Sequence, residues 1–270
     1  FHGYSKTDFD NNPKPMIILE YMPKGSLDKL FKDKKFMREN KPIRYIILIG
    51  IINAMQYLHH KGIVHRDLKP GNILIDENYY PRVGDFGSSI IYREKSQLPK
   101  RKEKRVGTPL YIAPEILLNE KDPYSYKVDV YSFSMIAYQL LTGNSPYYEK
   151  NFKKERHVLN AVVNGVRPDL SIIPDAEIAG FLQRCWSSDP LERPNFEEIR
   201  DYFTNNRKIQ MIFGINPQLL NENLMKLNNF YMWLRKSIDI EWSIPNELLE
   251  IEKVLKLYPE HESEFRRRLK

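Results

Sequence analysis

The sequence predicts an α+β fold: a mostly helical lobe, a small remnant of β structure before it and a helical extension after it. Three observations indicate this class. A short apolar run over residues 16–22 ends at Pro23 and Gly25, as a buried strand followed by a turn would. Over residues 42–60 the apolar side chains recur at helical spacing. Residues 130–141 are apolar on nearly all sides, which is typical of a helix in the centre of a helical lobe.

The other elements follow in chain order. Ser26 is placed to cap a short helix, and Gly62 follows the end of the long one. Residues 72–75 and 82–83 have the character of two short strands joined by a turn, so we expect a hairpin that brings Asp85 back beside Asn72. Further helices are expected over residues 178–186 and 196–203, and two more from the apolar stripes of residues 220–234 and 248–258.

Composition narrows the class of protein. With 270 residues, 41% hydrophobic and 12% aromatic, the chain can bury a substantial core and is not disordered. No apolar run reaches the length of a membrane span, so we expect none. The single cysteine, Cys185, cannot form an internal disulfide and suits a reducing compartment, which predicts a cytoplasmic protein.

Much of the formal net charge of +7 comes from one segment. Seven Lys and Arg side chains lie in residues 93–105, against two Glu side chains. A nucleic-acid surface is one interpretation of this segment, and a nuclear-import run between Lys100 and Arg105 is another. A solvated basic loop is the simpler interpretation, so we do not expect the chain to bind nucleic acid. A nuclear location is the alternative to a cytoplasmic one.

The chemistry is concentrated in two short runs. The first is His65-Arg66-Asp67-Leu68-Lys69-Pro70-Gly71-Asn72, and the second is Asp85-Phe86-Gly87. Together they supply a carboxylate that can accept a proton and oxygen ligands suited to Mg²⁺, which is the pairing that phosphoryl transfer from ATP requires. The alternative interpretation, that Asp67 and Asp85 are surface acids without a chemical role, does not account for the residues around them.

These runs resemble the catalytic and metal-binding loops of the eukaryotic protein kinase family. Asn72 follows Asp67 at the spacing H-R-D-L-x-x-x-N. Gly107-Thr108-Pro109-Leu110-Tyr111-Ile112-Ala113-Pro114-Glu115 matches the end of the family's activation segment. The resemblance covers about residues 1–207 and implies a protein-kinase-like fold. It divides the chain into residues 1–25 (remnant of the small lobe and hinge), 26–207 (C-terminal lobe) and 208–270 (helical extension).

The resemblance implies a role for each matching residue. Asp67 would accept the proton of the substrate hydroxyl, and Lys69 would neutralise charge on the transferred phosphoryl group. Thr108 would hydrogen-bond the side chains of Asp67 and Lys69. Asn72 and Asp85 would hold Mg²⁺. Seven further positions are expected to act structurally: His65, Arg66, Phe86, Gly87, Glu115, Asp129 and Arg193.

Within that structural set, the resemblance implies three arrangements. His65 and Phe86 would stack in the core, Asp129 would hold the backbone of the catalytic loop, and Glu115 would form a buried ion pair with Arg193. Arg66 would pair with a phosphate on the following loop, for which Ser96 is the candidate; an unmodified loop serine is the equal alternative.

On the nucleotide side, the family pattern implies that ATP binds at the hinge. Leu19 would line the back of the adenine pocket and Leu74 its floor, although ordinary core packing is a competing interpretation for both. The remaining candidates are the backbones of Glu20 and Met22 for the adenine edge, and Ser26 or Asp28 for the ribose.

Two details narrow the class, and one motif is missing. Lys69-Pro70 is typical of serine/threonine kinases, and Cys185-Trp186 resembles the tyrosine-kinase-like branch. The resemblance therefore implies ATP and Mg²⁺ as cofactors and protein substrates with Ser or Thr acceptors. No G-x-G-x-x-G occurs in the 270 residues. We therefore expect a fragment or truncated product of a kinase, with a catalytically inactive kinase-like scaffold or partner-binding module as the alternative.

Overall fold

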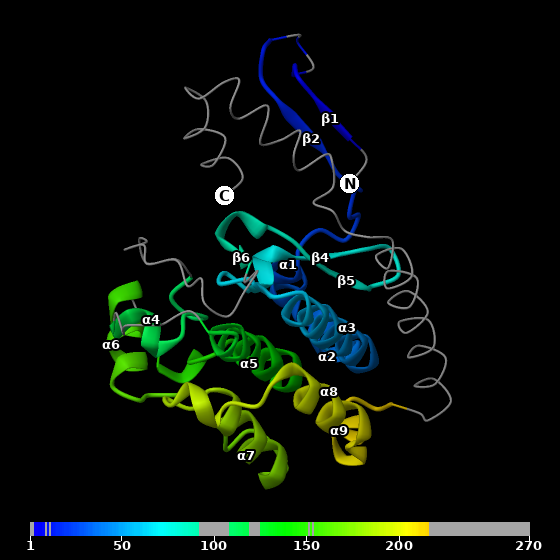
Figure 1. Ribbon diagram of the computed structural model, residues 1–270. Coiled ribbons are helices and arrows are strands. Elements are labelled where there is room, and N and C mark those ends of the chain that lie inside the picture. Colours follow the sequence, from blue (N-terminus) through cyan, green and yellow to red (C-terminus); the bar gives the residue numbers. More distant parts are fainter. Residues whose placement is uncertain are drawn as a thin grey trace.

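The computed structural model describes residues 3–8, 10, 12–91, 108–118, 125–150, 152 and 154–215. Helices form the main body, and one antiparallel pair, β1 (Gly3–Ser5) with β2 (Met16–Ile18), stands off one end of it (Figure 1). Two more antiparallel pairs lie between that end and the long helices: β3 (Ile63–Val64) with β6 (Ile90–Ile91), and β4 (Ile73–Ile75) with β5 (Pro81–Val83). The predictions for Ser96, for the basic segment 93–105 and for helices over 220–234 and 248–258 fall outside the described residues.

The strand predicted over residues 16–22 is too long. β2 ends at Ile18, which pairs with Gly3, and the chain then leaves the ladder. Ile18, Leu19 and Tyr21 are 47%, 61% and 84% exposed. The sequence pattern indicated a buried strand, but a two-stranded sheet alone buries little apolar surface, and the described residues place no third strand beside this pair.

Three helices follow: α1 (Leu27–Lys32), α2 (Lys34–Glu39) and α3 (Lys41–His60). The sequence pattern missed α2, a six-residue helix whose N-cap, Asp33, accepts a hydrogen bond from the Phe36 N–H at 2.9 Å. Ser26 occupies the N-cap position of α1 but makes no capping bond, because its hydroxyl donates to Asp28. α3 ends where predicted, and Gly62, at φ +75°, turns the chain just beyond it.

β4 and β5 form the predicted hairpin. Ile73 pairs with Val83, and the Gly84 N–H donates to the Asn72 carbonyl at 2.8 Å. Asn72 therefore lies opposite Gly84, the residue that immediately precedes Asp85. The pairing of β3 with β6 was not predicted, since the whole hairpin separates the two strands in the chain.

α5 (Lys127–Thr142) is the core of the helical lobe, as its apolar residues predicted. Every residue from Val128 to Leu141 is buried, and α5 packs against α3 and α7 (Ala176–Cys185) (Figure 1). α7 and α8 (Phe196–Asn205) match the predicted helices to within two residues at each end. The remaining helices of the described chain are α4 (Pro114–Leu118), α6 (Glu155–Val163) and α9 (Arg207–Ile212). Across the described part of the chain, none combines the length and the apolar composition that spanning a membrane requires.

Candidate active site

The loop after β3 gathers donors around the carboxylate of Asp67. Lys69 Nζ lies 2.7 Å from Oδ2. Asn72 Nδ2 donates to the same oxygen at 3.1 Å and to the Asp67 carbonyl at 2.8 Å. Thr108 Oγ1, 41 residues further along the chain, donates to Oδ1 at 3.5 Å. The Asp67 side chain remains 13% exposed, so the carboxylate is both oriented by its neighbours and accessible to a substrate hydroxyl.

A buried aspartate in the first turn of α5 holds the backbone of this loop. Asp129 has no exposed surface, and it accepts hydrogen bonds from the backbone N–H groups of His65 at 2.8 Å and Arg66 at 2.9 Å. His59 Nε2, from the last turn of α3, lies 2.8 Å from the same carboxylate. The sequence analysis did not predict this contact. No local signal pointed to it, because the two partners are 70 residues apart.

Further contacts tie this loop to the segment after Asp85. Arg66, which has a positive φ of 67°, donates through Nε to the Ser88 carbonyl. Ser89 Oγ donates to the His65 carbonyl at 3.3 Å. With the β3–β6 pairing, these bonds hold the segments 65–72 and 85–89 against each other.

Asp85 and Phe86 lie at the end of the hairpin beside His65. His65 Nε2 is 2.9 Å from the Gly84 carbonyl, and Asp85 has a left-handed backbone (φ 59°, ψ 70°), which is strained for a residue with a side chain. The rings of His65 and Phe86 have centroids 5.4 Å apart. However, Phe86 is 48% exposed, so the prediction that it lies in the core is wrong: one side of the ring meets His65 and the other is open. Gly87 follows in the turn η2 (Phe86–Ser88) and is also exposed.

The oxygen donors at this end of the hairpin fit Mg²⁺. The Nδ2 atom of Asn72 is engaged by Asp67, which leaves Oδ1 as its donor to a cation. Asp85 adds a carboxylate next to the residue that pairs with Asn72. No cluster of three or more His, Cys, Asp or Glu side chains suited to a metal occurs among the described residues. A cation held by one amide and one carboxylate, with phosphate oxygens and water completing its shell, suits Mg²⁺ better than a closed protein cage.

The candidate nucleotide residues divide into two groups. The first is anchored to the hairpin: the Ile75 N–H donates to the Gly25 carbonyl at 2.8 Å, and Ser26 forms a bridge with Leu74. The Asp28 carboxylate accepts a hydrogen bond from the Ser26 hydroxyl and forms an ion pair with Lys32 at 3.0 Å. Both contacts lower the pKa of the Asp28 carboxyl, and the hydrogen bond from Ser26 contributes most. This group therefore forms a connected edge beside β4.

The second group is open to solvent. Leu19 is 61% exposed, and Glu20 is exposed as well, whereas Met22 is half-buried and its carbonyl accepts from the Gly25 N–H at 3.0 Å. Core packing, the competing interpretation for Leu19, is therefore wrong. The described chain does not cover Leu19 as the back wall of a pocket would be covered.

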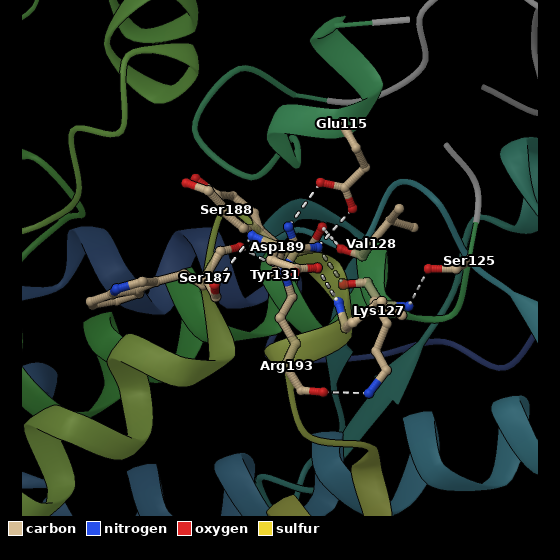
Figure 2. A network of polar contacts seen from close by, with 12 residues as sticks. Glu115, Ser125, Lys127, Val128, Tyr131, Ser187, Ser188, Asp189 and Arg193 are labelled. Atoms are coloured by element: carbon tan, nitrogen blue, oxygen red, sulfur yellow. Dashed lines mark hydrogen bonds and ion pairs between the residues drawn. The ribbon is translucent and has the colours of Figure 1, made fainter. Parts of the chain in front are cut away.

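The end of the activation segment is fixed by a buried ion pair, shown in Figure 2. Arg193 donates to Glu115 through both terminal nitrogens, at 2.7 Å and 2.8 Å, and both residues are buried. Arg193 also donates through Nε to the Ser187 carbonyl at 2.9 Å and through Nη1 to the Lys127 carbonyl at 2.9 Å. Lys127 in turn donates to the Arg193 carbonyl, and burial lowers the pKa of its ammonium group.

An open groove of about 430 Å³ begins at Thr108, beside Asp67. Pro109 and Leu110 form one wall, and Phe152 and Val158 contribute apolar surface on the side of α6. The groove therefore leads from the side of Asp67 along a mostly apolar surface of the helical lobe.

Comparison with known proteins identifies the family of this chain. Residues 6–203 match the family described as protein kinase domain, and the chain belongs to the protein kinase family. This confirms the protein-kinase-like fold that the two motifs implied.

Individual relatives align over about seven tenths of the chain. It is 39% identical over 191 residues to the dual specificity protein kinase shkB of Dictyostelium discoideum, covering 68% of this chain and 28% of that protein. It is 36% identical over 188 residues to the serine/threonine-protein kinase STY46 of Arabidopsis thaliana, covering 69% of this chain and 31% of the relative. A third relative is the cell cycle serine/threonine-protein kinase CDC5/MSD2 of Saccharomyces cerevisiae, 34% identical over 199 residues, 72% of this chain and 26% of that protein. The chain thus spans less than a third of these relatives.

Proposed function

We propose that this chain is the catalytic lobe of a protein serine/threonine kinase that transfers the γ-phosphoryl group of Mg-ATP to Ser or Thr hydroxyls of proteins. The observation that carries the proposal is the Asp67 carboxylate held between Lys69, Asn72 and Thr108. The family membership supports phosphoryl transfer in general. The names of two relatives and the Lys69-Pro70 pair support Ser/Thr as acceptors.

In this proposal each residue has one chemical task. Asp67 accepts the proton of the acceptor hydroxyl as the new oxygen–phosphorus bond forms and the bond from γ-phosphorus to the β–γ bridging oxygen breaks, releasing ADP. Lys69, 2.7 Å from Asp67, balances the negative charge of the transferred group. Bound Mg²⁺ would neutralise phosphate charge, and Asn72 and Asp85 would hold it. Ser26, Asp28 and Leu74 would line the nucleotide site along β4.

The groove that begins at Thr108 would hold the substrate peptide. Its apolar lining by Leu110, Phe152 and Val158 favours an apolar side chain near the acceptor residue. The proposal also includes three finer points. The kinase belongs to the tyrosine-kinase-like branch, it is located in the cytoplasm, and its C-terminal lobe comprises residues 26–207.

A second candidate function is a kinase-shaped binding module that transfers nothing. One observation favours it: Leu19 at the hinge is 61% exposed, so the described chain leaves the adenine side of the nucleotide site open to solvent.

One experiment separates the two functions. The full chain is incubated with labelled ATP, Mg²⁺ and a generic basic protein, alongside Asp67→Ala and Asp85→Ala. The control is Asp201→Asn, an exposed aspartate whose ion pair within the described part of the chain is with the neighbouring Arg200. We expect phosphate on Ser or Thr, a loss of about a hundredfold or more in Asp67→Ala, and normal transfer in the control. Absence of transfer, together with no shift in melting temperature on adding Mg-ATP, would establish the binding module instead.

A further inference from the structure

A second hollow, of about 550 Å³, lies away from Asp67 on the α7 side of the helical lobe. It is formed by the turn after α6, the last turns of α7 and the loop that leads into η4 (Pro190–Glu192). None of the residues assigned to phosphoryl transfer lines it, so it is separate from the proposed active site.

The inner wall of this hollow carries a fixed guanidinium. Arg167 donates through Nε to the Trp186 carbonyl at 2.9 Å, and through Nη1 to the carbonyls of Val162 and Val166, both at 2.9 Å. Its Nη2 donates to Ser188 Oγ at 2.9 Å. All of these acceptors are neutral, and no carboxylate of the described chain pairs with Arg167. The hollow therefore holds a rigid positive charge that lacks a counter-ion, with one Nη2 hydrogen unassigned.

The other polar groups around the hollow are mainly donors. Arg184 lies on the last turn of α7, and its guanidinium has no carboxylate partner within the described ranges. It lies over the ring of Phe181, 5.9 Å from the ring centroid. Trp186 is 1% exposed, and its buried indole N–H has no acceptor in the described structure. Trp186 is one of the residues that line the hollow, so its indole N–H resonance reports on a ligand that binds there.

One acidic group also lines the hollow. Glu192 Oε2 accepts the Ser187 hydroxyl at 2.6 Å, which directs that oxygen toward its own loop. Two arginines against one glutamate leave the hollow positively charged. The face of Trp186 is unavailable for stacking, because the ring is buried beside Tyr138, with centroids 6.0 Å apart. A flat base would find no platform, whereas a compact anion would find several donors.

We propose that this hollow binds the phosphate group of a small phosphorylated ligand, through Arg167, Arg184 and Ser188. The dianion of a phosphate monoester offers acceptor oxygens in several directions and has no donor on its phosphate group, which matches the excess of donors around the hollow. The volume exceeds that of phosphate alone, so the rest of the ligand would extend toward the open side. The inference does not depend on the proposed function.

Binding is tested by titrating the ¹⁵N-labelled full chain, without nucleotide, with orthophosphate and with phenyl phosphate. We expect the indole N–H resonance of Trp186, assigned with Trp186→Phe, to shift saturably, with half-saturation at about 1 mM for orthophosphate. Sodium chloride at matched ionic strength and acetate should not reproduce the shift. Arg184→Gln should weaken binding about fivefold or more, since it removes a charge without removing any backbone contact.

Two further variants locate the site. Arg200→Gln removes an arginine outside the hollow and should bind phosphate normally. Lys69→Met should also bind phosphate normally, because Lys69 lies beside Asp67 and does not line the hollow. Arg167→Lys tests the fixed fork itself, with circular dichroism to check folding. A shift that follows ionic strength alone, an equal response to acetate, or equal affinity in Arg184→Gln and Arg200→Gln would overturn the proposal.

Discussion

Asp67 and Asp129 show how surroundings give the same side chain different tasks. Asp129 has no exposed surface and accepts two backbone N–H groups, so its oxygens are committed to holding the loop. Asp67 accepts from Lys69 and Asn72 but keeps 13% of its side chain exposed, so it can still reach a reacting hydroxyl. Burial and the number of committed donors distinguish the carboxylate of Asp129, which holds the loop, from that of Asp67, which we propose as the proton acceptor.

Replacing Asp129 should destabilise the whole domain. Asp129→Ala leaves the N–H groups of His65 and Arg66, and His59 Nε2, without their acceptor. We expect a loss of about 3 kcal/mol in the free energy of unfolding, measured by urea denaturation. Asp201→Ala, at an exposed site, should change it by less than about 0.5 kcal/mol. Equal stability of the two variants would contradict the role assigned to Asp129.

Cys185 should be unreactive in the folded chain. Its thiol is fully buried, and burial raises the pKa well above the ordinary value, so the thiolate that reacts with disulfides is scarce. Ellman's reagent should detect essentially no thiol in the native protein and one per chain in guanidinium chloride. Rapid reaction of the native protein would show that the α7–α8 region opens.

At the scale of elements, sequence patterns succeeded where a segment carries its own signal. α3 was predicted because its apolar residues recur at helical spacing, and α5 because its residues are apolar on nearly all sides. The hairpin β4–β5 was predicted because its turn is local. α2 was missed because its six residues are too few for a periodic pattern. β2 was overestimated because a run of apolar residues does not reveal whether a partner strand exists to bury it.

A glycine that ends a helix and a glycine inside a helix should respond in opposite directions to alanine. Gly143 ends α5 with a φ of +80°, so Gly143→Ala should cost about 1–2 kcal/mol through backbone strain. Gly180 lies inside α7, and an added methyl group would meet nothing within 4 Å, so Gly180→Ala should stabilise by about 0.5–1 kcal/mol. Thermal denaturation of both variants checks the pair. A melting temperature that moves the same way in both would refute the assignment of the two backbone conformations.

At the scale of the molecule, the Glu115–Arg193 pair joins the end of the activation segment to the loop between α7 and α8. The two residues are 78 positions apart in the chain and bond through two nearly equal contacts, visible in Figure 2. Ser187, whose carbonyl accepts from Arg193, neighbours Ser188 of the proposed phosphate site. The same loop therefore supports both features.

Removing one charge of this pair should lower the free energy of unfolding strongly. Removing both charges should lower it by less than the sum of the two single changes. Glu115→Gln leaves a buried guanidinium without its counter-ion and should lose about 3–5 kcal/mol of unfolding free energy. The double variant Glu115→Leu with Arg193→Met should cost clearly less than the two single changes together, as a double-mutant cycle in urea would measure. Strict additivity would mean that the two charges do not interact.

The candidate site was only partly predictable. The residues of the segments 65–72 and 85–87 were identified from the sequence, since the residue types and their spacing state the chemistry directly. The contact of His59 with Asp129, the exposure of Phe86 and the bond between Ser26 and Asp28 were not predicted. Each depends on which segments meet in space, and no local pattern encodes that.

The sequence by itself determined the long helices, the hairpin and the motifs that place the chain in the protein kinase family. These depend on side-chain periodicity and on spacing over a few residues, which short-range physics is enough to interpret. Only the tertiary structure decided that His59 contacts Asp129, that Leu19 is open, and that Arg167 is held rigidly with no carboxylate partner among the described residues. Those properties arise where distant segments remove each other from water, so they exist only once the chain has folded.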